Sequence, residues 1–527
     1  VISSCQFPDR WSGSWFQKGV QDPIYIYNGT ISSKGVCREV SGDKFLIESR
    51  TESCYRCVVI HEKHMNVLQY KETYCSLPNE RPWLDGLCLQ ISGDALLYSM
   101  FRLDTVPVPC PFRGSFTFTY SRGHGECNYP VSTVHPCTDD SRMTFNFKAC
   151  ANVITSESRE EILTCLASWK EGSTRYLVAK MEHKGTKTDD DKFRCFVYDR
   201  LQDDSGFRIA QSGDATCDGL FSAVEGSRTM KLNRVRHSHG KCQFPNWISA
   251  AERWRTLDTL LTYVFSDPNT SFHIYSSISE ELMTRALCNS VNHVTDDATR
   301  LVVQSSSGCS HGFVCMEFHR RTQHILEIQE GEMRSRPTDA CSSTYFNPRT
   351  NQFTTLTSSA PSTEECPLVG RYMIQSSQPQ MAKFVSDDLK NTFCSEHLES
   401  GCRANDRLEF LSECSTERSA KSFQCHGSWR ENETYYLIAS ALRTRRRYCI
   451  VFTEDDKTLR FSGSPSECLR NIKLGRDGFI AFSLSGKSLC SDTNGSSRHS
   501  WLLLTILAIL LTMFPSLIRG VANLECV

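Results

Sequence analysis

The chain has 527 residues, which is too long for a single hydrophobic core and predicts about three to five domains. Its 59 Lys and Arg nearly balance its 60 Asp and Glu, so no overall field would draw it to nucleic acid, and no nucleic-acid partner is expected. Its 27 cysteines far exceed what a reduced cytosolic protein carries, so we expect them to be oxidised outside the cell.

Residues 1–108 are predicted to form a cysteine-rich β domain, called A. The chain begins at Val1 rather than Met, which favours a removed signal peptide. The opening CQFPDRWSGSWF contains Gly13-Ser-Trp15, and a Gly-x-aromatic triplet resembles the first strand of lipocalin-like barrels, where the aromatic ring plugs the barrel floor. Short runs rich in β-branched residues predict strands at 36–40, 44–49, 56–62 and 87–93.

Residues 109–241 are predicted to form an eight-cysteine β domain, called B. It also opens with a Gly-x-aromatic triplet, Gly114-Ser-Phe116. Strands are expected at 114–121, 143–149, 175–182 and 192–199, with a solvated hairpin tip at 184–192. Residues 157–169 are expected to be helical.

Residues 242–365 are predicted to form a second cysteine-rich domain, A′. LVVQSSSGCSHGFVCMEFH repeats the plan of FLIESRTESCYRCVVIHE in A: an apolar run, a polar turn, two near cysteines and an alternating run. Helices are expected at 250–263 and 279–291. Cys242 lies on the boundary between B and A′ and is open to pairing with either.

Residues 366–490 are predicted to repeat domain B as B′. From Cys165 the sequence reads CLASWKEGSTRYLVA and from Cys425 it reads CHGSWRENETYYLIA, with 8 of 15 positions identical. Strands are expected at 435–441 and 448–454. Repeated cysteine spacing indicates a repeated fold, because disulfides fix loop ends in space. The two series expected in disulfides are Cys110, Cys127, Cys137, Cys150, Cys165, Cys195, Cys217 and Cys242, and Cys366, Cys394, Cys402, Cys414, Cys425, Cys449, Cys468 and Cys490.

A dense basic cluster, Arg443, Arg445, Arg446 and Arg447, falls between the two strands expected in B′. Three interpretations remain open: a charged turn that limits aggregation, a binding site for sulfated glycans, or a processing site. A disulfide at Cys449, directly after the cluster, would disfavour processing. This cluster is the possible glycan-binding site.

The C-terminal part reads as a stalk at 491–500 and an uncharged hydrophobic segment at 501–518. Eighteen such residues nearly suffice to cross a bilayer. The segment is therefore either a transmembrane helix or a lipid-anchor signal, and small residues after Asn494 slightly favour the latter. Cys526 follows this segment, which leaves an even number of cysteines before it.

The fold class that emerges is mainly β: small antiparallel sheets or barrels stapled by disulfides, duplicated as A–B–A′–B′, with a C-terminal hydrophobic anchor helix. Four sequons fit a secreted glycoprotein. The asparagines expected to be glycosylated are Asn28, Asn269, Asn432 and Asn494.

No catalytic constellation emerges, and no cofactor, metal site or enzyme activity is expected. The near histidine pairs 61/64, 237/239 and 319/324 lie in strands or polar turns and not in a zinc-binding helix, so they are interpreted as surface histidines. The sequence contains no Gly-x-Ser-x-Gly elbow and no phosphate-binding glycine loop.

The opening CQFPDRWSGSWF, the CxxSWxExxTxYLxA blocks and the A–B–A′–B′ order resemble an invertebrate family of secreted or membrane-anchored proteins with four tandem cysteine-rich domains of unknown function. The resemblance implies an extracellular protein without a known activity. We therefore expect a non-enzymatic cell-surface glycoprotein on the outer face of the plasma membrane, held by its C-terminal anchor, that binds an extracellular protein or glycan. The alternatives are a tethered carrier of an apolar ligand in lipocalin-like barrels and an extracellular enzyme.

Overall fold

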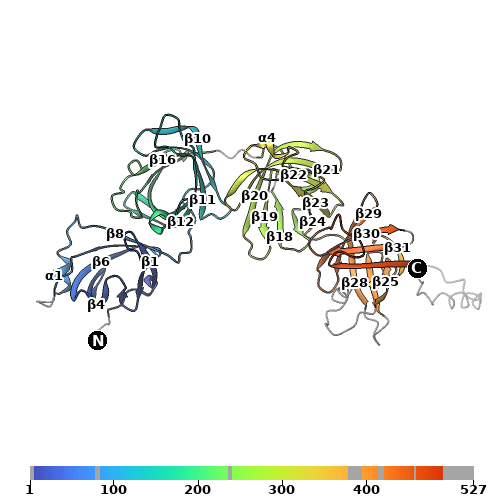
Figure 1. Ribbon diagram of the computed structural model, residues 1–527, viewed down its shortest axis with the longest axis horizontal. Helices are drawn as coiled ribbons and strands as arrows, with labels where there is room; N and C mark the ends of the chain where they lie inside the picture. The colour runs from blue at the N-terminus through green and yellow to red at the C-terminus, as the bar shows by residue number, and fades with distance from the viewer. Residues whose placement is uncertain are drawn as a thin grey trace, which may run out of the picture.

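The described residues of the computed structural model form four closed barrels, each of eight antiparallel strands, that follow one another in chain order along an arch (Figure 1). The structure describes residues 5–77, 83–235, 240–266, 268–377, 395–412, 420–455 and 458–490. The mainly β prediction with tandem disulfide-stapled barrels is thus confirmed, whereas the predicted stalk and anchor at 491–518 lie outside the described residues.

The first barrel is an up-and-down barrel that closes when β1 pairs with both β2 and β8. Its core includes the fully buried side chains of Trp15, Val58 and Tyr70. A single 3₁₀ turn, η1, precedes it and a short helix, α1, covers one side. The elements are η1 (Asp9–Trp11), β1 (Gly13–Gln17), β2 (Ile24–Tyr27), β3 (Thr30–Ile31), β4 (Gly35–Ser41), β5 (Lys44–Ser49), β6 (Cys54–His64), β7 (Val67–Glu72), α1 (Leu84–Cys88) and β8 (Tyr98–Arg102).

The second barrel closes through pairing of β9 with β10 and β16. Alternate residues of its strands point inward, and the interior is filled by aromatic rings such as Phe118, Phe145 and Phe147, whose centroids lie 5.1–6.2 Å apart. The elements are β9 (Phe116–Ser121), β10 (Glu126–Pro136), β11 (Arg142–Phe147), β12 (Arg159–Glu171), β13 (Thr174–Glu182), α2 (Asp189–Lys192), β14 (Phe193–Arg200), β15 (Gly206–Gln211) and β16 (Arg228–Arg234).

The third barrel closes through pairing of β17 with β18 and β24. Its interior is also packed with apolar side chains, among them Trp254, Phe272 and Phe318. The elements are α3 (Asn246–Ser249), β17 (Arg253–Thr256), β18 (Leu261–Phe265), β19 (Ser271–Ser276), β20 (Leu282–Val294), β21 (Ala298–Ser307), β22 (Ser310–Arg320), β23 (Ile325–Glu330), α4 (Pro337–Ala340) and β24 (Phe353–Ser358).

The fourth barrel closes through pairing of β25 with β26 and β32. Its core contains Phe410, Phe423 and Phe482. The strands are β25 (Gly370–Ser377), β26 (Ser395–Ser400), β27 (Arg407–Ser412), β28 (Ala420–Glu431), β29 (Thr434–Ala441), β30 (Arg447–Asp455), β31 (Thr458–Ser464) and β32 (Ile480–Ser488).

The Gly-x-aromatic triplets close one end of the barrels. In the first barrel the guanidinium of Arg102 lies 4.4 Å from the Trp15 ring centroid and donates to the carbonyl of Ser12 at 2.7 Å. Gly13 has a φ of 133°, a backbone conformation that residues with a side chain rarely adopt, so the position favours glycine. In the second barrel Arg234 lies 5.3 Å above Phe116. In both barrels an arginine therefore lies over the buried aromatic residue of the triplet.

All 24 cysteines of the described residues form disulfides, and most connect positions within one barrel. Cys242 pairs with Cys288, which assigns it to the third barrel and resolves the ambiguity in the sequence. The predicted Cys394 and Cys414 lie outside the described residues. The pairs are 5–37, 54–75, 57–88, 110–165, 127–150, 137–309, 195–217, 242–288, 315–341, 366–425, 402–490 and 449–468.

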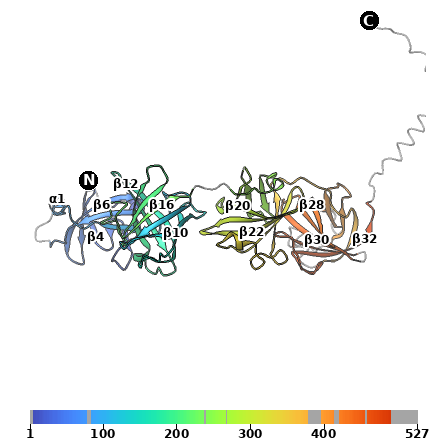
Figure 2. The same ribbon diagram turned by 90° about the horizontal axis from the view of Figure 1, so that it is seen from above.

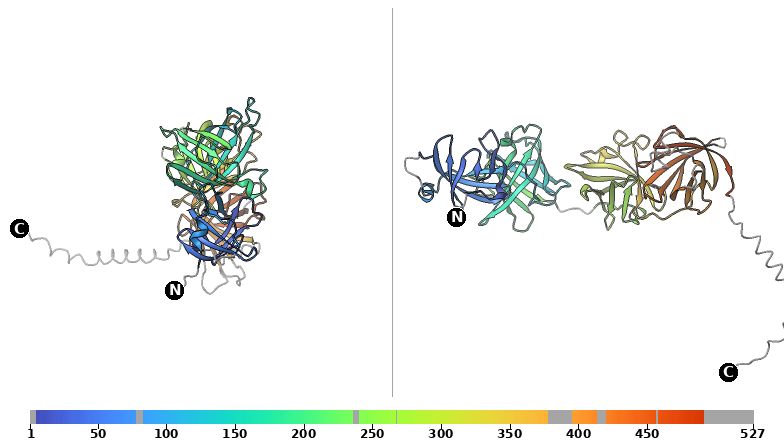
Figure 3. Two further views of the ribbon diagram at one scale, coloured as in Figure 1. Left: turned by 90° about the vertical axis from the view of Figure 1, so that its left-hand side faces the viewer. Right: turned by 90° about the horizontal axis from the view of Figure 1, so that it is seen from below.

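The barrels are grouped in two lobes, the first with the second and the third with the fourth (Figures 2 and 3). In the first lobe Phe16 stacks on Phe193 of the second barrel at 4.9 Å, within a buried apolar cluster. In the second lobe Leu257 and Ile325 pack against Ile438 of the fourth barrel. Within each lobe, the two barrels are therefore joined by an apolar interface.

The second lobe also contains a buried ion network between its two barrels. Glu327, which has no exposed surface, accepts hydrogen bonds from Arg470 Nη2 at 2.6 Å and from Arg321 Nε at 2.8 Å. Arg470 also donates to Glu431 at 3.0 Å. Burial alone would lower the pKa of Arg470, but its hydrogen bonds to Glu327 and Glu431 and their charges raise it above its ordinary value.

The contact between the lobes is polar and contains a disulfide, Cys137–Cys309. Thr138 N donates to the carbonyl of Gly308 at 2.9 Å. The rings of His135 and His311 lie 4.9 Å apart beside it. Arg285 Nη2 also lies 3.5 Å from Oδ1 of Asp140, so the joint combines a disulfide, hydrogen bonds and an ion pair.

Several expected elements are wrong in type. The helices predicted at 157–169 and 279–291 are strands β12 and β20, and 250–263 contains β17, a turn and the start of β18. The strand predicted at 87–93 is the end of α1 and a turn. No helix among the described residues is long and apolar enough to cross a bilayer.

Candidate basic surface at the seam of the third and fourth barrels

The predicted arginine cluster lies at the turn between β29 and β30. Arg445 N donates to the carbonyl of Ala441 at 2.8 Å, and Arg445 has a φ of 55°. Arg443, Arg445 and Arg446 are exposed, whereas Arg447 is half-buried. The hairpin therefore presents three guanidinium groups to solvent and turns the fourth toward the protein.

Arg447 connects this turn to the third barrel. Its Nη1 donates to the hydroxyl of Thr357, and its Nη2 donates to the carbonyl of Ser358 at 3.4 Å. Both partners lie on β24, which pairs with β17 through Arg255 and Thr357. The fourth arginine of the cluster is thus a structural contact across the seam.

Two further arginines lie on the third-barrel side of the seam. Arg253 and Arg255 alternate with buried residues on β17, and both are exposed. Burial, followed by the nearby positive charge of Arg255, lowers the pKa of Arg447. The charge of Arg255 on β17 is therefore close enough to affect Arg447, which holds the hairpin to the third barrel. The seam surface is defined here as Arg253, Arg255, Arg443, Arg445 and Arg446.

The seam surface consists of five positively charged side chains. Within the described part of the chain, none of these five arginines forms an ion pair with a carboxylate within 4.0 Å. Arg446 lies 5.8 Å from the ring centroids of both Tyr448 and Phe479, and Phe479 is itself 44% exposed. The surface therefore offers guanidinium groups and an aromatic ring to an anionic partner.

The predicted asparagine sites lie at turns where the structure describes them. Asn28 and Asn432 are exposed at left-handed positions, with φ of 44° and 53°. Asn269 is half-buried, and its Nδ2 lies 3.5 Å from Oδ1 of Asn246. Asn494 lies outside the described residues. Asn28 and Asn432 are thus the more accessible acceptors.

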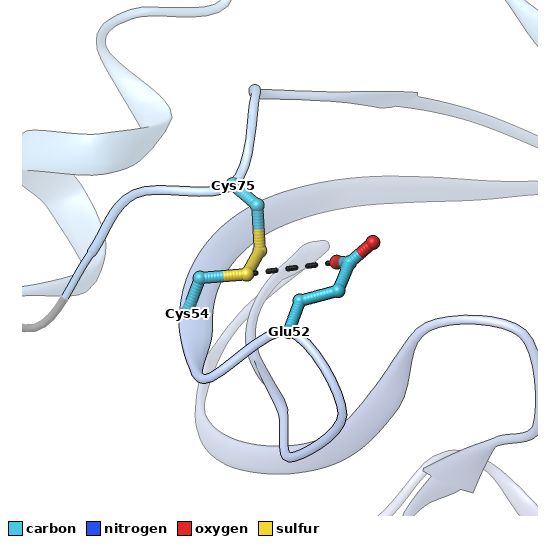
Figure 4. Close-up of side chains that lie close together, drawn as sticks. All are labelled: Glu52, Cys54 and Cys75. Atoms are coloured by element: carbon cyan, nitrogen blue, oxygen red, sulfur yellow. Dashed lines mark hydrogen bonds between the residues drawn. A yellow bond between two sulfur atoms is a disulfide. The ribbon is translucent and has the colours of Figure 1, made fainter.

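One group of potential metal ligands, Glu52, Cys54 and Cys75, lies at the edge of the first barrel (Figure 4). The two sulfurs are bonded to each other, so neither is a thiolate that could bind a metal ion. The Cys54 sulfur lies 3.6 Å from a Glu52 carboxylate oxygen, and because a disulfide sulfur has no proton to donate this is a van der Waals contact. The group therefore contains a single possible ligand.

The histidine pairs differ in environment. His61 is exposed, with Nδ1 3.5 Å from an oxygen of Asp43. His319 and His324 are half-buried, and their hydrogen-bond partners are Gln329 at 3.1 Å and Ser358 at 3.1 Å. His64 of the first pair is half-buried as well, so among the described histidines of these pairs only His61 is fully exposed. Residues 237 and 239 lie outside the described residues.

Comparison with protein families matches almost the whole series of barrels. Residues 106–234 and 362–499 match the family model described as Domain of unknown function (DUF7042). Residues 3–92 match Domain of unknown function (DUF7044), and residues 238–355 match Domain of unknown function (DUF7043). No curated protein matches the chain. The second and fourth barrels are thus two copies of one domain type, while the first and third are described by separate models.

Proposed function

The chain belongs to the family defined by the Domain of unknown function (DUF7042), and on this premise we propose that it is a non-enzymatic extracellular protein that binds sulfated glycans through the seam surface. The disulfides of the described barrels are typical of proteins that fold in an oxidising compartment. The observation that carries the proposal is a group of five exposed arginines, contributed by two packed barrels, that pair with no carboxylate of the described residues.

Sulfated glycans suit this surface because their charge is regularly spaced along a chain. Guanidinium groups form paired hydrogen bonds with tetrahedral oxyanions, and arginine is more weakly hydrated than lysine. The exposed ring of Phe479 beside Arg446 supplies an apolar contact for a sugar face. The apolar packing of the barrel interiors does not favour the alternative of a carrier for an apolar ligand.

Heparin chromatography of the purified protein tests this proposal. We expect the R443A/R445A variant to elute at clearly lower salt, because it removes two of the five exposed charges and screening weakens the rest. The R113A/R208A variant removes the same charge from exposed positions of the second barrel and serves as the matched control. Equal elution of both variants, or equal binding of wild type to desulfated heparin, would reject the seam surface as a glycan site.

We also propose that the protein is held at the cell surface by the segment 501–518. Surface biotinylation of intact cells should label it. Treatment with a phosphatidylinositol-specific phospholipase should release it if the segment is a lipid-anchor signal, and should leave it in place if the segment is a transmembrane helix. Detection only in the medium, with no cell-associated protein, would reject the tether.

A further inference from the structure

The second barrel has a polar pocket at the end opposite Phe116. β9 begins at Phe116 and β16 ends at Arg234, where the cation–π contact closes one end. At the other end the termini of β12 to β16 surround a pocket of about 380 Å³. This volume lies within the range of small-molecule sites. Its lining includes Arg122, Arg159, Arg194, Arg228, His183 and Gln211.

The floor of the pocket is an ion pair that seals the apolar core. Glu161, only 3% exposed, accepts from Arg228 Nη1 at 3.0 Å and from Arg159. The guanidinium of Arg228 also lies 4.6 Å from the ring centroid of Phe147, at the top of the aromatic core. An apolar ligand would therefore be kept out of the barrel, and a polar ligand would be held at its mouth.

The balance of charge at the mouth is positive. Four guanidinium groups face two lining carboxylates, Glu157 and Asp191, with Glu161 beneath them. Asp191 is already engaged by the hydroxyl of Thr188 at 2.8 Å. The pocket therefore has an excess of positive charge close to a buried arginine.

The side chains of His183 and Arg159 face each other, each with a hydrogen-bond donor. The backbone N–H of Gly185 donates to Nδ1 of His183 at 2.9 Å, so Nδ1 is an acceptor and Nε2 carries the ring proton. Nε2 lies 3.3 Å from Nη1 of Arg159, which is always a donor. Oε2 of Glu157 lies 3.6 Å from Arg159 Nη1, within ion-pair range but beyond hydrogen-bond distance. The two donors therefore face each other, and an oxyanion beside them would accept a hydrogen bond from each.

Gln211 supplies an independent sign of a ligand. Its side chain lines the pocket and is only 7% exposed, and its Oε1 is buried without a hydrogen-bond partner among the described residues. Leaving a buried amide oxygen unpaired is unfavourable, because the oxygen has lost its hydrogen bonds to water. A hydroxyl group of a ligand would supply the missing donor.

From these observations we propose that the mouth of the second barrel binds a small anionic sugar, one that bears a carboxylate or sulfate for Arg159 and His183 and a hydroxyl for Gln211. This site is separate from the seam surface. The pocket would bind a single sugar unit, whereas the seam surface would contact an extended glycan chain.

Isothermal titration of the purified protein with glucuronate, with glucose as the uncharged comparison and sodium sulfate as the bare anion, tests the proposal. We expect saturable binding of glucuronate, weaker binding of sulfate and none of glucose. The H183N variant keeps an acceptor for the Gly185 N–H but loses the Nε2 donor, and Q211L removes the amide; each should weaken binding at least tenfold. K184A removes a charge from the same turn without lining the pocket and should bind as wild type does.

The expected pattern depends on the pocket and not on the seam, so R443A/R445A should bind glucuronate as wild type does. Absence of glucuronate binding by the wild-type protein would overturn the proposal, as would equal affinity of H183N, Q211L and K184A. If sulfate binds but glucuronate does not, the pocket is a site for a bare anion, and the assignment of an anionic sugar is rejected. Because His183 lies on a partly exposed turn, H183N is informative even if Q211L does not fold.

Discussion

Cys137 of the second barrel is bonded to Cys309 of the third, although 172 positions separate them in the chain. Among the described disulfides this bond alone joins two barrels. In the fourth barrel the corresponding cysteine of the repeat, Cys402, bonds instead to Cys490 at the end of its own barrel. The same position of one domain type therefore serves as a connection in one copy and as an internal staple in the other.

Removal of this connection should separate the lobes without unfolding them. No strand pairing among the described residues crosses from the second barrel to the third, so C137S/C309S should change the unfolding free energy of each barrel by less than about 1 kcal/mol. Small-angle scattering should show a larger radius of gyration. C402S/C490S is the control and should leave the distance between lobes unchanged; unchanged scattering of C137S/C309S would contradict the prediction.

The ion network of the second lobe should be costly to break. E327Q removes the carboxylate charge that Arg321 and Arg470 share in a fully buried position, and the loss should be about 3–5 kcal/mol, because buried guanidinium charge is left uncompensated. Urea unfolding of the second lobe measures it. The control is E171Q, which removes the exposed pair with Lys63 in the first lobe and should cost less than about 1 kcal/mol. Equal losses would show that burial does not govern these contacts.

The stack between the first two barrels should depend on Phe193. F193A removes a fully buried ring that lies between Phe16 and Phe101, at 4.9 and 5.3 Å, and should destabilise the first lobe by about 3–5 kcal/mol. Phe221 of the same barrel is 76% exposed, so F221A should change stability by no more than about 0.5 kcal/mol. Thermal unfolding of the two variants provides the comparison, and a small shift for F193A would count against an apolar interface.

The joint between the lobes should weaken in acid. Burial, with the nearby imidazole of His135, lowers the pKa of His311 from 6.5 to about 4, and burial lowers the pKa of His135 as well. Between pH 6.5 and 4 the unfolded chain therefore binds more protons than the folded one. The unfolding free energy is therefore unaffected by His311 above pH 6.5. It decreases as the pH falls below 6.5, by at most about 1.4 kcal/mol per pH unit for His311.

Chemical unfolding of wild type and H311Q across this pH range measures the effect. Ser306 Oγ lies 2.8 Å from Nδ1 of His311, so glutamine is chosen to retain a polar group of similar length. The variant should have a flatter pH profile than wild type. Identical slopes would show that His311 does not carry the proton linkage.

The barrels could be predicted from local patterns, but some strands could not. The sequence predicts a helix at 279–291, where the structure has strand β20. Bulges between Cys288 and Ser290, and between Val291 and His293, interrupt the alternation of inward and outward side chains that would indicate a strand. β12 contains a similar irregularity between Cys165 and Ala167, in a stretch rich in helix-forming residues. Pairing with neighbouring strands outweighs these local preferences.

Only part of each candidate site could be predicted from the sequence. Arg443, Arg445 and Arg446 form a visible run in the sequence, whereas Arg253 and Arg255 join them only because β24 brings β17 beside the hairpin. Cysteine spacing indicated the repeat of B but not which cysteine would bond between barrels, since spacing alone does not determine connectivity. The pocket of the second barrel combines residues from β12 to β16 and their turns, and no short motif marks it.

The Cys402–Cys490 bond has a mechanical consequence. Cys490 directly follows β32, and its disulfide fixes the chain to the turn between β26 and β27. A force applied to residues beyond 490 would be transmitted to the fourth barrel through this covalent bond. The hydrogen bonds of β32 to its neighbouring strands would therefore not be broken one at a time. The barrel would resist such a load as a unit, and the strand closest to the point of traction would be the one best shielded from it.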